Sequence, residues 1–115
     1  MAEQEKVYPV ELLPPAQYEL EEIARLHIQL SGSASARKIT DGIYDALEQL
    51  SHFPFSGAPI RDEELRAIGY RYVVVKNYLV IYRQIDGTVY IYHIVHGKTN
   101  YPTLFRTNYF QNKSE

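Results

Sequence analysis

The sequence predicts an α+β fold in which a hairpin of two helices packs on a four-stranded antiparallel sheet. Two observations predict it. Three runs rich in Val, Ile and Tyr lie between residues 70 and 95, and two amphipathic stretches precede them between residues 14 and 50. Helices grouped apart from antiparallel strands are typical of α+β domains. With one more strand expected near the N-terminus, the element order is β-α-α-β-β-β.

The first expected elements are an edge strand and a helix. Residues 6–13 alternate loosely and contain Pro9, and a proline cannot donate to a strand ladder, so this strand belongs at a sheet edge. Pro14 and Pro15 suit the first turn of a helix, and Gly32 ends it. One face of this helix is expected to pack inward, and its residues are Leu20, Ile23, Leu26, His27 and Leu30.

A second helix is expected from about Ser33 or Ser35 to Leu50. Its apolar residues recur at intervals of three and four, which is the spacing of one helical face. They are Ala36, Ile39, Ile43, Leu47 and Leu50. The short Ser-Gly-Ser link predicts that the two helices form an antiparallel hairpin.

The segment after the second helix carries two aromatic side chains and a charged stretch. Phe53 and Phe55 are expected to fill the junction between the helices and the sheet. Residues 58–69 resemble a charged connector, in which one helical turn is expected at Glu63–Ile68.

Three antiparallel strands are expected at residues 70–75, 78–82 and 89–95, because branched and aromatic residues suit a pleated surface. Asp86-Gly87 predicts a tight turn before the last strand, since glycine accepts positive φ, and Asn77 does the same less well before the middle strand. Strict alternation gives the last strand one face with Val89, Ile91, His93 and Val95. His93 is therefore interpreted as a structural histidine with a satisfied ring.

The composition is that of a globular chain of 115 residues, a size typical of one domain. The absence of cysteine excludes disulfides, thiol catalysis and cysteine-bound metal. No apolar run has membrane-spanning length, so we expect a cytoplasmic protein without membrane contact. Residues 1–64 carry 12 acidic and 5 basic side chains, whereas residues 65–115 carry 2 acidic and 7 basic ones. Either the sheet half faces a polyanion or an acidic partner, or the acidic residues simply line solvated helix faces.

Several short motifs resemble a known family. They are Leu50-Ser-His-Phe-Pro-Phe-Ser-Gly57, Gly69-Tyr-Arg71, Asn77-Tyr-Leu-Val-Ile-Tyr-Arg83 and Val95-His-Gly97. In order and spacing, over roughly residues 7–105, they resemble the RelE/ParE superfamily of toxins from bacterial type II toxin–antitoxin modules, and its ParE branch above all. The resemblance implies one toxin domain at residues 1–106, followed by a polar, flexible tail at residues 107–115.

The same resemblance implies a function. It implies a toxin that arrests growth, serves plasmid stabilisation, and is bound and silenced by a cognate antitoxin in a hetero-oligomer. ParE-like members inhibit DNA gyrase by binding, whereas RelE-like members are ribosome-dependent mRNA endonucleases that need no metal. An inactive homologue that serves only as a binding module is a third expectation. No cofactor is implied.

The positions of the nuclease residues, carried over one by one, are mostly apolar here. Arg71 matches one basic position, but others fall on Val73, Leu79 and Thr99, and the tyrosine position falls on Phe105. This pattern favours gyrase inhibition. If the protein is a nuclease, proton transfer and phosphorane stabilisation are expected from Arg71, Arg83, His96, Lys98 and Tyr101.

The same strands are expected to bind the antitoxin. The residues concerned are Arg71, Leu79, Ile81 and Arg83. Alternation within each strand, together with the geometry that the resemblance implies, places both arginines on one concave face of the sheet.

Overall fold

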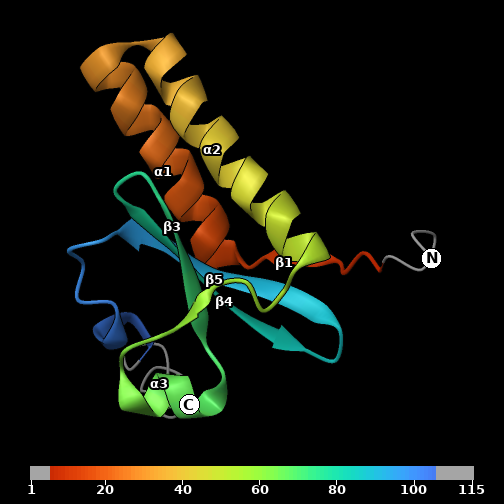
Figure 1. Ribbon diagram of the computed structural model, residues 1–115. Coiled ribbons are helices and arrows are strands. Elements are labelled where there is room, and N and C mark those ends of the chain that lie inside the picture. The colour runs from red at the N-terminus through yellow and green to blue at the C-terminus, as the bar shows by residue number, and fades with distance from the viewer. Residues whose placement is uncertain (1–5, 106–115) are drawn as a thin grey trace.

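The computed structural model describes residues 6–105 (Figure 1). The elements are β1 (Val10–Leu12), α1 (Pro14–Ser31), α2 (Ser33–His52), β2 (Ala58–Pro59), α3 (Glu63–Ile68), β3 (Arg71–Val75), β4 (Tyr78–Ile85) and β5 (Thr88–His96). The predicted α+β fold is confirmed, because α1 and α2 form a hairpin that packs on one face of the sheet. Within residues 6–105, no helix is long and apolar enough to cross a membrane. The tail expected at residues 107–115 lies outside the described residues.

The sheet has five strands in the order β1-β5-β4-β3-β2, where four were expected. β1 lies at an edge as predicted, but it runs parallel to β5, with Val10 beside Val89. The expectation of a fully antiparallel sheet is therefore wrong at this edge. Alternation carries no information on strand direction. The direction is fixed where β1 leads into α1, since the Leu13 N–H donates to the Ile91 carbonyl of β5 (3.0 Å).

The fifth strand, β2, comes from the segment expected to be a connector. It pairs antiparallel with the start of β3, and Ala58 lies opposite Tyr72. Two residues, one of them Pro59, are too few to produce an alternating pattern. Just before β2, the Gly57 N–H donates to the Tyr82 hydroxyl (2.9 Å). A Cβ at Gly57 would lie 2.6 Å from that hydroxyl oxygen, so only glycine fits without rearrangement.

The helical hairpin forms as predicted but extends beyond the sheet (Figure 1). Gly32 alone joins the helices, with φ of 93°. The five apolar residues predicted for α2 are all buried: Ala36, Ile39, Ile43, Leu47 and Leu50. In α1, Leu20 and Ile23 are buried, but Leu26 is 46% exposed and Leu30 70% exposed. The predicted inner face of α1 is therefore only covered along its first half.

The turns that flank β4 use positive φ, as two-residue hairpin turns do. Asp86 and Gly87 have φ of 52° and 83°. In the other turn it is Lys76, with φ of 55°, that takes the left-handed conformation and not Asn77.

β5 contains a β-bulge that its sequence pattern does not reveal. Ile81 of β4 pairs with His93, and the next residue of β4 pairs with Ile91, so Tyr92 is an extra residue. Beyond the bulge, the residues of β5 point to the opposite sheet faces from those that strict alternation predicts. Ile94 joins Ile91 in the core under the helices, whereas His93 lies beside Ile81 on the opposite face. The predicted grouping of His93 with Ile91 is wrong for this reason.

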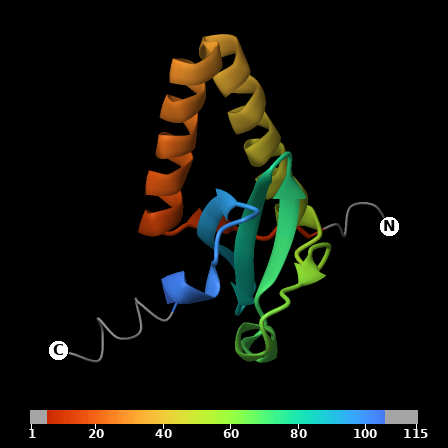
Figure 2. The same cartoon turned by 90° about the vertical axis from the view of Figure 1, so that its left-hand side faces the viewer.

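A second, smaller core lies on the sheet face away from the helical hairpin, which we call the outer face. Its buried members are Ile60, Leu65, Tyr70 and Ile81. α3, at the predicted position, contributes Leu65, and the Asp62 carboxylate caps the helix by accepting the Leu65 N–H (3.1 Å). A single helical turn at residues 102–105, which we call the C-terminal turn, adds Phe105 (Figure 2).

Phe53 and Phe55 do not fill the junction between the helices and the sheet, so that expectation is wrong. They are 56% and 65% exposed, on either side of the buried Pro54. The fully buried Tyr82 ring belongs to the core under the helices, and its hydroxyl holds the chain at Gly57. Phe53 and Phe55 therefore remain on the surface, because the Tyr82 ring already occupies the junction.

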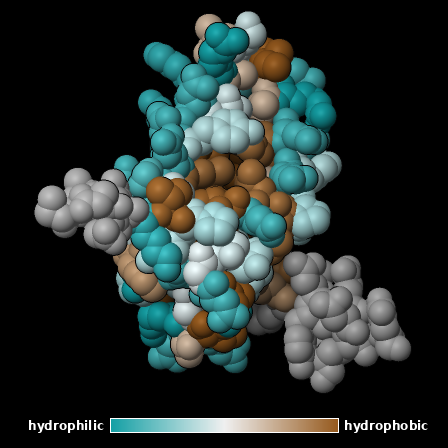
Figure 3. Space-filling view, turned by 90° about the vertical axis from the view of Figure 1, so that its right-hand side faces the viewer, coloured by the Kyte–Doolittle hydropathy of each residue, from teal (hydrophilic) through white to brown (hydrophobic). Residues whose placement is uncertain are grey.

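On the side that carries β1, apolar side chains gather in a hollow between the helical hairpin and the strands (Figure 3). Hydrophilic side chains surround it. A groove between the two helices and β1 is lined by Leu12, Gln17, Leu20, Glu21, Ala24, Thr40 and Tyr44.

Gly57→Ala should lower the free energy of unfolding by about 2 kcal/mol, because the added methyl overlaps the Tyr82 hydroxyl and the Tyr72 carbonyl. Urea unfolding followed by circular dichroism measures the change. Gly97→Ala is the matched control, since its nearest atom would lie at 3.5 Å, an ordinary contact. Equal stabilities of the two variants would contradict the close approach at Gly57.

Candidate functional site

Arg71 begins β3 on the sheet face that packs against the helices, opposite Tyr82. Its Nη1 donates to the Gly57 carbonyl (2.6 Å) and the Phe55 carbonyl (3.3 Å). The guanidinium also lies over the Phe55 ring, 5.3 Å from its centroid. Burial raises the pKa of the Tyr82 hydroxyl, while the Gly57 N–H and the Arg71 charge partly offset that rise. The Arg71 charge is therefore engaged with the chain just before β2.

Arg83 lies on the outer face, opposite to Arg71. It follows Tyr82 in β4, and successive strand residues face opposite sides. Its guanidinium lies 5.6 Å from the centroid of the Tyr70 ring. Burial, followed by the neighbouring Tyr92, raises the pKa of Tyr70 to about 12, although Arg83 acts in the other direction. The expectation that Arg71 and Arg83 share one concave face is wrong, because their positions in the register differ by one residue.

The other three residues of the expected nuclease set lie at and after the end of β5. His96 and Lys98 are exposed, and the His96 Nδ1 accepts the Lys98 N–H (3.1 Å). This bond leaves Nε2 as the protonated nitrogen of the neutral ring. Tyr101 is half-buried against the second core. The structure therefore does not bring the five residues together on one face.

A further polar contact lies near this end of the sheet. The His27 Nε2 is 2.9 Å from the hydroxyl of Tyr78, whose ring meets the His96 ring edge-on at 5.9 Å. Burial raises the pKa of the Tyr78 hydroxyl. His27, which the sequence placed on the inner face of the first helix, thus ties the middle of α1 to the start of β4.

Of the residues expected to bind an antitoxin, Leu79, Ile81 and Arg83 share the outer face, and Arg71 does not. Ile81 is fully buried in the second core, so it supports this face without being available for contact. Leu79 is half-buried and Arg83 is half-buried beside Tyr70.

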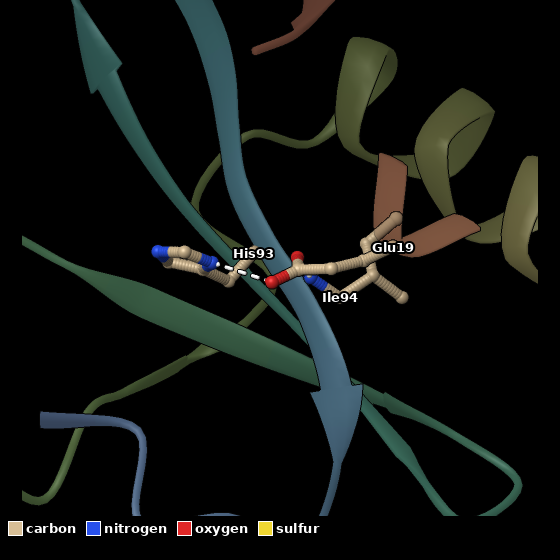
Figure 4. A network of polar contacts seen from close by, with 3 residues as sticks. All are labelled: Glu19, His93 and Ile94. Carbon is tan, nitrogen blue, oxygen red and sulfur yellow. Dashed lines mark hydrogen bonds and ion pairs between the residues drawn. The ribbon is translucent and has the colours of Figure 1, made fainter. Parts of the chain in front are cut away.

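A largely buried contact between a carboxylate and a histidine joins α1 to β5 at the bulge (Figure 4). The Glu19 Oε2 lies 2.9 Å from the His93 Nδ1, and its Oε1 accepts the Ile94 N–H (2.8 Å). β1 reaches only as far as Ile91 along this edge, so Glu19 serves the next stretch of β5. The interpretation of His93 as a satisfied structural histidine is confirmed.

Sequence reasoning missed the role of Glu19, although a signal was present. Glu19 precedes Ile23 by four residues and therefore lies on the inner side of the helix. A carboxylate on an apolar face requires a partner, and His93 on an apolar strand requires one as well.

The C-terminal turn packs on the same contact. The Phe105 ring meets the His93 ring edge-on at 5.1 Å and the Tyr70 ring at 4.8 Å. Helix α1, the bulge of β5 and the last described residues are thus connected through one cluster. Among residues 6–105, no group of three or more His, Asp and Glu side chains is placed to hold a metal ion.

Comparison with known proteins places this arrangement in a family. A family model described as the ParE toxin of the type II toxin–antitoxin system parDE matches residues 10–101. The chain belongs to the ParE toxin family. This ParE-family toxin matches no curated protein significantly.

Two solved structures share the fold of this toxin. A chain of the chromosomal ParDE toxin–antitoxin system from P. aeruginosa aligns with a TM-score of 0.66 at 17% identity, covering 78% of this chain and 96% of that one. A chain of the RelBE2 toxin–antitoxin complex from Mycobacterium tuberculosis aligns with a TM-score of 0.59 at 23% identity, covering 79% and 92%. At these identities the likeness supports the fold alone.

Glu19→Ala should destabilise the toxin by about 3 kcal/mol, because it leaves the Ile94 N–H and the buried His93 ring without their acceptor. Glu21→Ala, an exposed residue of the same helix, should change stability by about 0.5 kcal/mol or less. Urea unfolding at neutral pH compares the two. A loss in Glu19→Ala no larger than in Glu21→Ala would refute the role of this carboxylate.

Stability should also fall in alkaline solution. The pKa of Tyr70 rises from 10.0 to about 12 in the folded chain, so the unfolded chain loses this proton first. The contribution of the protonated Tyr70 hydroxyl to the free energy of unfolding is complete below about pH 10 and is lost as the pH rises toward 12. Tyr70→Phe should show a shallower decline in urea midpoint between pH 9 and pH 11 than the wild type. Tyr18→Phe, an exposed control, should decline as the wild type does.

Proposed function

We propose that this toxin arrests growth by binding DNA gyrase and inhibiting it, and that it does not cleave mRNA. The observation that carries the proposal is the placement of Arg71 and Arg83 on opposite faces of the sheet. Metal-free RNA cleavage requires a base, an acid and cationic groups around a single phosphate. Two arginines on opposite faces do not serve one phosphate.

The surroundings of the individual residues support the same conclusion. The Arg71 guanidinium is held by two main-chain carbonyls, and Arg83 lies over an aromatic ring. Tyr101 packs against the second core, on the sheet face opposite to Arg71. The outer face is the main surface available for binding. A toxin that inhibits its target by binding requires such a surface but no catalytic residues.

We also propose that a cognate antitoxin binds the toxin in the cytoplasm and neutralises it in a hetero-oligomer. Both solved neighbours come from toxin–antitoxin systems. Leu79 and Arg83 remain the residues proposed for antitoxin contact, because both lie on the outer face and neither is fully buried.

An induced-expression assay tests the mechanism. Growth arrest is expected together with relaxed or cleaved plasmid DNA on supercoiling gels, and with intact mRNA ends by primer extension. Purified toxin should inhibit supercoiling by gyrase in vitro. Arg83→Ala and His96→Ala should leave mRNA as intact as Arg61→Ala, an exposed arginine outside the expected nuclease set. Codon-positioned mRNA cuts that disappear in Arg83→Ala, but not in Arg61→Ala, would establish the nuclease mechanism instead.

A further inference from the structure

Two turns lie side by side at one end of the sheet (Figure 1). One is the turn between β3 and β4, residues 76–77, and the other is the end of β5 with the segment after it, residues 96–100. The Gly97 N–H donates to the Asn77 carbonyl (2.8 Å), so the main chains of the two turns are joined. We call residues 76–77 and 96–100 the basic end of the sheet.

The composition of the basic end differs from that of a protein-binding surface. Its residues are Lys76, Asn77, His96, Gly97, Lys98, Thr99 and Asn100, and all except Thr99 are exposed. None of them is acidic or apolar. Protein–protein interfaces depend on aromatic and other large anchors, whereas the phosphates of nucleic acids are contacted by Lys, Thr and Asn side chains and by main-chain N–H groups. The basic end therefore has the composition of a phosphate-binding surface.

The backbone holds these groups in a fixed arrangement. The His96 Nδ1 accepts the Lys98 N–H (3.1 Å), and the His96 carbonyl accepts the Thr99 N–H (2.9 Å). Because Nδ1 is the acceptor, the neutral His96 ring carries its proton on Nε2, which remains a hydrogen-bond donor. Lys98 and this donor thus belong to one closed turn, and little ordering of the chain is required when they bind a ligand.

Lys76 occupies a backbone position that does not suit lysine. Its φ is 55°, in the left-handed region, where glycine and asparagine are favoured and other residues are uncommon. Asparagine is the next residue, Asn77, yet the lysine takes this conformation. Strain of this kind costs stability and is concentrated at functional sites. The lysine at this position is therefore explained by its side chain and not by the turn.

The charges of Lys76 and Lys98 are not neutralised by the protein. Within residues 6–105, neither ammonium group forms an ion pair. Between residues 66 and 105 the sequence contains one acidic residue, Asp86, in the turn at the other end of β4 and β5. From the helices, Asp41 and Asp45 lie on the part of α2 that approaches the end of β3, and neither pairs with these lysines. The basic end therefore keeps a positive charge that favours a polyanion.

We propose that the basic end binds the phosphate backbone of duplex DNA, namely the DNA on which gyrase acts. The choice of duplex DNA rests on the proposed function. A toxin bound to gyrase meets the enzyme's DNA at a high effective concentration, so a site with few charges is sufficient. The toxin is then held by two contacts, one with the protein and one with the DNA, and its hold on gyrase is strongest while DNA is present.

Binding of DNA to the purified full chain tests the site. The probe is a fluorescently labelled duplex of about 20 base pairs, and its anisotropy is followed between about 20 and about 200 mM salt. The logarithm of the binding constant should fall with the logarithm of salt concentration with a slope of about −1.8 or steeper, because each neutralised phosphate contributes about −0.9.

Lys98→Gln should weaken binding at low salt at least about fivefold and make the slope shallower by about 0.9. Arg61→Gln is the matched control. It removes the same charge from an exposed residue near α3, beyond the other end of β3, and should change the affinity by less than about twofold. Circular dichroism confirms that both variants are folded.

Lys76→Asn separates a role in binding from a role in the turn. It should weaken DNA binding at least about fivefold because it removes a charge, and yet raise the urea midpoint because asparagine suits a φ of 55°. Lys76→Arg keeps the charge and should retain the affinity and the salt slope of the wild type. Lys76→Asn with unchanged DNA affinity would show that the lysine serves no binding role.

Three further results overturn the proposal: no binding of the duplex at low salt, equal effects of Lys98→Gln and Arg61→Gln, or tighter binding of single-stranded RNA of the same length, which assigns the site to RNA. Gyrase is absent from these measurements. A toxin that binds DNA in this way but fails to inhibit supercoiling contradicts the proposed function alone. A toxin that inhibits supercoiling without binding DNA contradicts this inference alone.

Discussion

The β-bulge at Tyr92 is the constraint on which both cores depend. Before the bulge, β5 gives Ile91 to the core under the helices, and after it Ile94 takes that place. The extra residue allows Tyr92 and His93 both to serve the outer face, where they meet Phe105. Glu19 secures the arrangement from α1 by accepting the Ile94 N–H and contacting His93. One irregular residue thus allows a single strand to contribute to both packing layers.

The parts of the fold that could be predicted from the sequence depend on local pattern. The stripe of α2, the position of α3, and the turn at Asp86 and Gly87 each follow from residues close together in the chain. The parts that could not be predicted depend on distant partners. The direction of β1 is set by β5, and β2 contains too few residues to show a period. The bulge inserts one extra residue into β5, and a strictly alternating pattern cannot predict such an insertion.

The candidate site shows the same division. The family could be inferred from motif order, and the set Leu79, Ile81 and Arg83 does share a face. The prediction that Arg71 lies on the same face was wrong. Alternation within one strand does not show which face a residue of the neighbouring strand shares until the register between the strands is known. Glu19 was missed because its partner is 74 residues away in the chain. Ile81 is buried because α3 places Leu65 on that face, and strand alternation alone does not reveal such a long-range contact.

The overhanging end of the helical hairpin has a consequence for how the molecule opens. Past the sheet, α1 and α2 are held mainly by one another, with Leu26 and Leu30 largely in solvent and Gly32 as the sole link. We expect this region to exchange its amide hydrogens by local opening, and the turns that pack on the sheet to exchange more slowly. Since nothing lies within 4 Å of a Cβ placed on Gly32, the tip is also where the chain best tolerates inserted residues or a fused domain.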